Sequence, residues 1–162
     1  MVRVLTIYDS RTGNTEKAAL KVAEGVKEFE GVECKILRID DARVEDLLEA
    51  DGIIIGSPTY YGLMNGKVKE FLDRSVKVHG RLEGKVGAAF TSSGGTASGA
   101  ETTILSILKA LLIHGMIVQG NSHNQHYGLA VVGAPDKREE ELCISFGSRV
   151  ARLVKRVASS EG

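Results

Sequence analysis

A glycine-bounded run of isoleucines, Gly52-Ile53-Ile54-Ile55-Gly56, limits what this chain can fold into more than any other stretch. Consecutive β-branched residues favour a strand, and a strand without polar alternation must be covered on both faces. Similar aliphatic runs alternate along the chain with segments of helical periodicity. This alternation predicts an α/β fold, a doubly wound parallel sheet with helices on both of its faces.

The pattern predicts five strands with an addition at one edge: Val2–Tyr8, Val32–Ile39, Gly52–Gly56, Val86–Phe90, Met116–Val118, and Ala130–Val132. The second strand alternates in polarity and is therefore expected at an edge of the sheet. With 162 residues, and without a linker, repeat or low-complexity tract, the chain is expected to form one domain over residues 1–162.

Apolar stripes predict the helices between these strands. Expected are a helix over 15–29, a short one over 44–49, one capped by Asn65 with a stripe from Val68 to Val76, one opened by a Ser98–Glu101 capping box, and a last one opened by Pro135-Asp136 with Glu139. Cys34 and Cys143 fall at apolar positions and lack metal-ligand spacing, so both are expected to be reduced core residues.

Charge and hydropathy exclude several classes of partner. The chain has 21 basic and 21 acidic residues, so no overall field attracts nucleic acid or an anionic membrane. Its N-terminus lacks a signal-peptide pattern, and its first apolar run is too short to span a bilayer. We therefore expect a cytoplasmic protein with no nucleic-acid partner and no membrane insertion.

The first loop, Ser10–Thr15, lies between a predicted strand and a predicted helix. Free N–H groups in the first helical turn and the positive end of the helix dipole favour an anion at such a place. Thr12 and Thr15 add hydroxyl donors, and Gly13 lets the backbone come close to a ligand. This loop therefore predicts a binding site for a phosphorylated cofactor.

Two further loops have unusual compositions and follow neighbouring strands. The second loop, Ser57–Gly66, contains Tyr60 and Tyr61, which could stack on a flat heterocycle or simply cover the sheet edge. The third loop, Thr91–Gly99, has no side chain larger than threonine, so it offers backbone N–H groups to a ligand or forms a flexible connection. In a doubly wound sheet the three loops should meet at the carboxyl ends of the strands.

Better-known phosphate motifs are absent. A P-loop would need lysine after Gly99, where Ala100 stands. No G-x-G-x-x-G follows the first strand, which excludes the dinucleotide fingerprint. A receiver-type phosphorylation switch lacks its acceptor aspartate, because the third strand ends in Gly56-Ser57-Pro58.

These motifs carry a family resemblance over nearly the whole chain. Ser10-x-Thr12-Gly13-x-Thr15 resembles the phosphate loop of the flavodoxin-like superfamily, whose members bind FMN. The stretches 56–66, 90–103 and 114–116 resemble the WrbA-type NAD(P)H:quinone oxidoreductases. The resemblance implies a flavodoxin-like, five-stranded sheet in the order 2-1-3-4-5.

The resemblance also implies the FMN-binding residues. The phosphate would be held by Ser10, Arg11, Thr12, Gly13, Asn14 and Thr15. The ring and ribityl chain would lie against Pro58, Thr59, Tyr60, Tyr61 and Gly62, and the ring edge against Ser92, Ser93, Gly94, Gly95 and Thr96. His114 would reach the flavin, if not from its own chain then across a subunit contact. From the residues alone, the favoured interpretation of His114 is a histidine that interacts with the last carbonyls of a helix, and only the resemblance brings the two interpretations to equal weight.

This chain departs from the WrbA pattern in ways that bear on the acceptor. It is shorter, has Tyr60 where the family usually has arginine, and contains no tryptophan, with His79 or Val78 near the place of the family's quinone-binding tryptophan. His126-Tyr127-Gly128 corresponds to the family's Pro-Tyr-Gly turn near the site.

We expect an FMN-dependent oxidoreductase that transfers two electrons from NAD(P)H to a quinone-like acceptor, as a homo-oligomer. The small third loop and the neutral chain favour one open face of the flavin, and no catalytic side chain or metal site is expected. Two alternatives stay open: an electron-carrying flavodoxin, and a flavodoxin-like scaffold for another phosphorylated ligand or for proteins.

Overall fold

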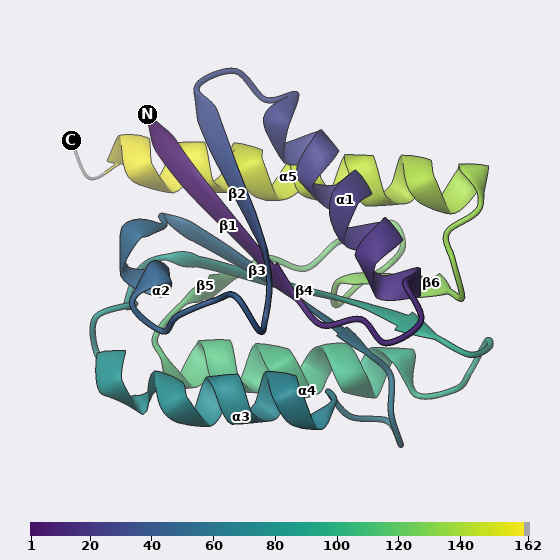
Figure 1. The fold of residues 1–162 in the computed structure, drawn as a ribbon. Coiled ribbons are helices and arrows are strands. Elements are labelled where there is room, and N and C mark those ends of the chain that lie inside the picture. Colours follow the sequence, from purple (N-terminus) through teal and green to yellow (C-terminus); the bar gives the residue numbers. More distant parts are fainter. Residues whose placement is uncertain (161–162) are drawn as a thin grey trace.

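A computed structural model describes residues 1–160 as a parallel sheet between two layers of helices (Figure 1). The strands are β1 (Val2–Tyr8), β2 (Val32–Arg38), β3 (Gly52–Pro58), β4 (Val86–Ser93), β5 (Ile117–Val118) and β6 (Leu129–Val132). The helices are α1 (Asn14–Lys27), α2 (Asp46–Glu49), α3 (Gly66–Arg74), α4 (Ala100–Ile113) and α5 (Lys137–Ser160), with a 3₁₀ helix η1 (Ser75–Val78) after α3. None of the helices within residues 1–160 is long and apolar enough to cross a bilayer.

The sheet has the predicted order, β2-β1-β3-β4-β5, with every pair of strands parallel. β5 pairs with the start of β4 at Val86 and Gly87, whereas β6 pairs with the end of β4 over Phe90–Ser93. The two short strands therefore form one interrupted edge, and residues 119–128 loop out between them.

Both faces of the sheet are buried, as the isoleucine run predicts. Ile53 and Ile55 pack with α3 and α4, while Ile54 packs on the opposite face with α1 and α5. The expected exposure at the other edge is also confirmed, because residues 32–36 of β2 alternate between half-buried and exposed. β3 is thus the central strand that sets the two-layer cover.

Two glycines allow α1 and α5 to approach each other closely. A Cβ atom on Gly147 would lie 2.0 Å from the carbonyl oxygen of Val22, and one on Gly25 would lie 1.9 Å from that of Ile144. A larger residue at either position would push the helices apart. This packing fixes the direction of α1, whose N-terminus begins at the first loop.

Two of the predicted helix caps are confirmed. The side chain of Asn65 accepts a hydrogen bond from the amide of Val68 at 3.1 Å. Asp136 and Glu139 each accept a hydrogen bond from the other's amide, at 2.8 and 3.2 Å. Cys143 is fully buried as predicted, whereas Cys34 at the sheet edge is only half-buried.

Two local predictions were wrong. The Ser98–Glu101 capping box does not form, because Gly99 takes the N-cap position of α4 in a left-handed conformation with φ 94°. The Ser98 hydroxyl donates to the carbonyl of Thr96 instead. Val76 does not belong to a buried stripe, since α3 ends at Arg74 and Val76 lies on η1 with 71% of its surface exposed.

Candidate functional site

The three loops meet at the carboxyl ends of β1, β3 and β4. Tyr8 pairs with Gly56 and Pro58 with Ser92, so the strands end side by side. The amide of Thr59 donates to the carbonyl of Ser92 at 2.9 Å, which ties the second loop to the third. The side-chain amide of Asn65 donates to the carboxylate of Asp9, the residue directly before the first loop, and so ties the second loop to the start of the first.

The first loop leaves a group of backbone donors free. Gly13 has φ 93° and is the N-cap of α1, and its amide donates to the Ser10 hydroxyl at 3.1 Å. Among residues 1–160, no partner is found for the amides of Thr12, Asn14, Thr15 and Glu16. These amides also carry the helix dipole, equivalent to about +0.5 charge. The loop is built to receive an anion.

Arg38 braces this loop and was missed by sequence reasoning. Its guanidinium donates to the carbonyl of Ser10 at 2.7 Å and pairs with Glu16 at 3.1 Å. The Tyr8 hydroxyl donates to the same Glu16 carboxylate, and burial together with Glu16 raises the pKa of Tyr8. The available signal was positional: Arg38 ends the edge strand beside β1, directly opposite Tyr8.

The second loop turns sharply and presents its tyrosines to solvent. Tyr60 and Leu63 exchange two backbone hydrogen bonds, at 3.1 and 3.0 Å, around Tyr61 at φ 51° and Gly62 at φ 73°. Two positive φ values define a type I′ turn, which is strained for a tyrosine by about 1 kcal/mol or more. Tyr61 is fully exposed, and the Arg11 guanidinium lies 5.8 Å from the centre of the Tyr60 ring.

In the third loop, buried hydroxyls donate to backbone carbonyls, whereas several backbone amides have no partner among the described residues. Ser92 donates to the carbonyl of Gly133 at 2.7 Å, and Ser93 donates to that of Gly95 at 2.9 Å. No partner is found, within the described part of the chain, for the amides of residues 94–98. A Cβ atom on Gly99 would lie 2.7 Å from the Cα of Gly62, so the second and third loops are in contact.

Comparison with known proteins agrees with this arrangement. Residues 41–126 match the family described as NADPH-dependent FMN reductase. A flavodoxin from Aquifex aeolicus is 43% identical, covering 95% of this chain and 88% of that protein. The chain belongs to the flavodoxin-like superfamily.

Other relatives of this flavodoxin-like chain include an enzyme. An NAD(P)H dehydrogenase (quinone) from Archaeoglobus fulgidus is 35% identical, covering 97% of this chain and all of that protein. The solved structure of a flavodoxin described as a WrbA-like protein from Agrobacterium tumefaciens has a TM-score of 0.82 and 26% identity, covering 96% of this chain and 99% of that one. The α/β flavodoxin fold is thus shown, and the relatives include both flavodoxins and an NAD(P)H dehydrogenase (quinone).

His114 lies far from the three loops of its own chain. It follows α4, whose 14 residues span about 21 Å from the third loop to the opposite end of the sheet. The ring is buried, and its Nε2 lies 2.7 Å from the Ser75 hydroxyl. Since that hydroxyl donates its only proton to the carbonyl of Leu72, Nε2 must be the donor to Ser75.

The hydrogen bond to Ser75 replaces the contact with helix carbonyls that was expected for His114. The ring bonds to Ser75 and not to the last carbonyls of α4. Its other nitrogen, Nδ1, is buried without a partner among the described residues. Burial and the neighbouring His79, whose ring centre lies 5.5 Å away, lower the pKa of His114. A contact with a flavin across a subunit boundary stays a prediction.

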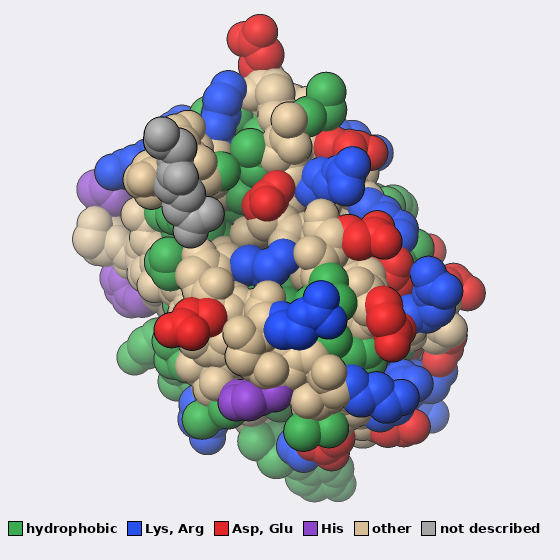
Figure 2. Space-filling model, turned by 90° about the vertical axis from the view of Figure 1, so that its left-hand side faces the viewer, with side chains coloured by type: hydrophobic (Ala, Val, Ile, Leu, Met, Phe, Trp, Pro, Cys, Tyr) green, Lys and Arg blue, Asp and Glu red, His purple; other side chains and the backbone are tan. Residues whose placement is uncertain are grey.

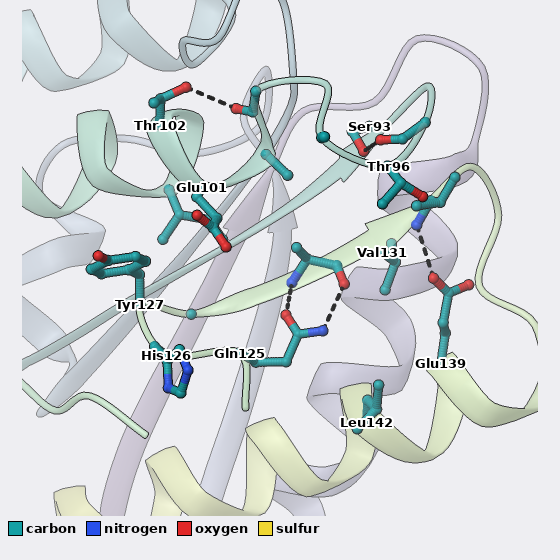
Figure 3. A pocket seen from close by; sticks show the side chains of 18 of the residues that line it. Ser93, Thr96, Glu101, Thr102, Gln125, His126, Tyr127, Val131, Glu139 and Leu142 are labelled. Atoms are coloured by element: carbon teal, nitrogen blue, oxygen red, sulfur yellow. Dashed lines mark hydrogen bonds between the residues drawn. The ribbon is translucent and has the colours of Figure 1, made fainter. Parts of the chain in front are cut away.

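A cavity of about 790 Å³ lies on the β6 side of the third loop (Figure 3). Its lining includes Thr96 from the third loop, Glu101 from α4, and His126 and Tyr127 from the loop between β5 and β6. Within residues 1–160, no three His, Cys, Asp or Glu side chains converge to hold a metal ion.

Proposed function

We propose that this protein binds FMN at the three loops and acts as an electron carrier of the flavodoxin type. The main support is the first loop, where four backbone amides at the positive end of the α1 dipole have no acceptor among the described residues. A phosphate group would satisfy them at once. The free amides of the third loop and the exposed rings of the second loop fit the polar edge and the flat face of an isoalloxazine.

The chain's own residues would hold and enclose the cofactor, which supplies the redox chemistry when bound. Ser10 and Gly13 would shape the phosphate site, and Arg38 would hold the Ser10 carbonyl through its hydrogen bond. Tyr60 or Tyr61 would cover the ring and exclude water from it. Each of these is a binding or positioning role, so none requires a proton to move.

The ionisable groups at the site are engaged in hydrogen bonds, which is compatible with a carrier and equally with a flavin-based reductase, because neither needs a protein acid or base. The Asp9 carboxylate is hydrogen-bonded by Asn65, and the Glu16 carboxylate is held by both Arg38 and Tyr8. Neither is free to act as a general acid or base. The 43% identical flavodoxin, with 95% of this chain aligned, is what favours the carrier.

A second candidate is a reductase that passes electrons from NAD(P)H to a quinone. It is supported by the 35% identical quinone dehydrogenase and by the match to the FMN reductase family. The small side chains of the third loop, none larger than threonine, favour it as well, because they would leave room for a substrate over the ring.

Anaerobic stopped-flow mixing of the FMN-loaded protein with NADH or NADPH distinguishes the two. The carrier proposal expects no bleaching of the flavin by either nucleotide within seconds, but rapid bleaching by dithionite or a reduced one-electron donor. Rapid bleaching by NADH or NADPH, followed by reoxidation on adding a quinone, would establish the reductase instead.

A further inference from the structure

The cavity beside the third loop runs along the outer edge of β6, between the N-terminal ends of α4 and α5 (Figure 3). Its apolar walls come from Ile104 on α4, Val131 on β6 and Leu142 on α5. A volume of about 790 Å³ is ample for a small ring, and apolar walls with a few polar groups are typical of small-molecule sites.

The backbone of this edge strand is already occupied. The side-chain amide of Gln125 accepts from the amide of Ala130 at 2.8 Å and donates to its carbonyl at 3.1 Å, as a neighbouring strand would. The amide of Val132 donates to Glu139 at 2.9 Å. An added peptide strand would have to displace these contacts, so the cavity is better suited to a ligand that uses side-chain groups.

Two of the side chains that line the cavity offer acceptors. His126 Nδ1 lies 2.7 Å from the carbonyl oxygen of Asn121. Because a carbonyl only accepts, Nδ1 carries the proton, and Nε2 of the neutral ring is left as an acceptor. The Glu101 carboxylate has no hydrogen-bond or ion-pair partner among the described residues, and the half-exposed Tyr127 offers an aromatic face.

The charges around the cavity favour a cation. Three carboxylates, those of Glu101, Asp136 and Glu139, line it against one guanidinium, that of Arg138. The helix dipoles add the equivalent of about +0.5 charge at each of the N-termini of α4 and α5. The net charge around the cavity is therefore roughly one negative unit. An aromatic face adds to the attraction for a cation.

We propose that this cavity is a second ligand site, which takes a small planar cation with N–H donors, such as an aromatic amidine or a protonated N-heterocycle. The N–H groups would donate to Glu101 and to His126 Nε2, and the ring would lie against Tyr127. This site goes beyond the electron-carrier function. Its lining contains no residue of the first or second loop, but it shares Ser93, Gly95 and Thr96 with the third loop of the proposed FMN site.

Three probes of one shape test the charge preference: benzamidine, benzamide and benzoate, which are cationic, neutral and anionic. Each is titrated into the FMN-loaded protein while backbone amide NMR signals are followed. We expect benzamidine to shift the amides of Thr96, Glu101 and Tyr127 and to bind about tenfold more tightly than benzoate, with benzamide between them. Equal binding of all three, or no shift at these amides, overturns the proposal.

Matched variants test the location. Glu101→Gln should remove most of the preference for benzamidine, whereas Glu141→Gln, an exposed glutamate on α5 outside the cavity lining, should not. Val132→Trp should narrow the cavity and weaken benzamidine binding at least fivefold, while Val76→Trp at the other end of the sheet leaves it unchanged. Similar effects of both members of a pair would contradict this location.

The two ligands must also be independent. Benzamidine should bind with the same affinity, within about twofold, before and after FMN is added to the apoprotein. Displacement of benzamidine by FMN would show that the cavity is part of the cofactor site, and would overturn the proposal of a second site.

Discussion

The two ends of the sheet treat their backbone polar groups in opposite ways. At the amino end the connections close on themselves, as the amides of Asp51 and Val86 donate to the carbonyls of Arg3 and Asp51. The Lys85 ammonium also donates to the carbonyls of Leu48 and Ala50, and burial lowers its pKa. At the carboxyl end, no partner is found among residues 1–160 for four amides at the first loop and for those of residues 94–98 in the third loop. One end supplies stability and the other keeps donors for a ligand.

The surface chemistry agrees with this division. Viewed from the side of the chain's N-terminus, Lys and Arg side chains are interspersed with Asp and Glu (Figure 2). Mixed charge of this kind gives no directed attraction to one ligand. A substitution at the carboxyl end should therefore alter cofactor binding, whereas one at the amino end should alter the stability of the fold.

The largest expected effect is that of Thr12→Asp on the exposed first loop. Two unit charges about 5 Å apart near a surface repel by about 3 kcal/mol, so FMN affinity should fall roughly a hundredfold. Thr12→Asn, which has a similar shape without the charge, should lose less than tenfold. Flavin fluorescence titration measures both, and a Thr12→Asp protein that still purifies yellow would show that the phosphate lies elsewhere.

At the amino end, Ser75→Ala should lower the free energy of unfolding by about 1–3 kcal/mol, because it leaves the buried His114 without its one acceptor. Ser159→Ala, which removes an exposed hydroxyl that donates to the carbonyl of Lys155, should change it by less than 0.5 kcal/mol. Urea denaturation checks both. A loss of FMN affinity in Ser75→Ala at equal folding would break the division between the two ends.

A smaller effect is expected for Arg38→Met, which removes the brace of the Ser10 carbonyl. Since Arg38 is partly exposed, the loss of FMN affinity should be about 1 kcal/mol, or roughly fivefold. Arg3→Met is the matched control, because Arg3 lies at the amino end and pairs with the exposed Glu33. Equal affinities of the two variants would rule out a role for Arg38 in the cofactor site.

The smallest effect concerns pH. His114 has a lowered pKa in the folded protein, so below about pH 6.5 the unfolded chain binds a proton more readily than the folded one. Stability should therefore fall as the pH drops through that value, and this part of the slope should disappear in His114→Gln. Denaturation midpoints measured from pH 7.5 to 5 check it, and an unchanged slope in the variant would assign the pH dependence to other groups.

The sequence predicts features that depend on neighbouring residues better than features that depend on contacts between distant segments. The isoleucine run and the alternating strand β2 predict the fold because the polarity of each residue indicates whether that position is buried or exposed. The Asn65 cap is equally local. The role of Arg38 required knowing which strand lies beside β1, and the N-cap at Gly99 depends on a close approach to Gly62 from another loop. Contacts between segments far apart in sequence were therefore the ones missed.

The relative affinity for FMN and riboflavin tests the central claim most directly, because the two ligands differ only in the phosphate. The apoprotein is titrated with each, and flavin fluorescence reports binding. Free amides at the first loop predict that FMN binds at least a hundredfold more tightly than riboflavin. Equal affinities, or no binding of either flavin, would contradict the assignment of the three loops as an FMN site.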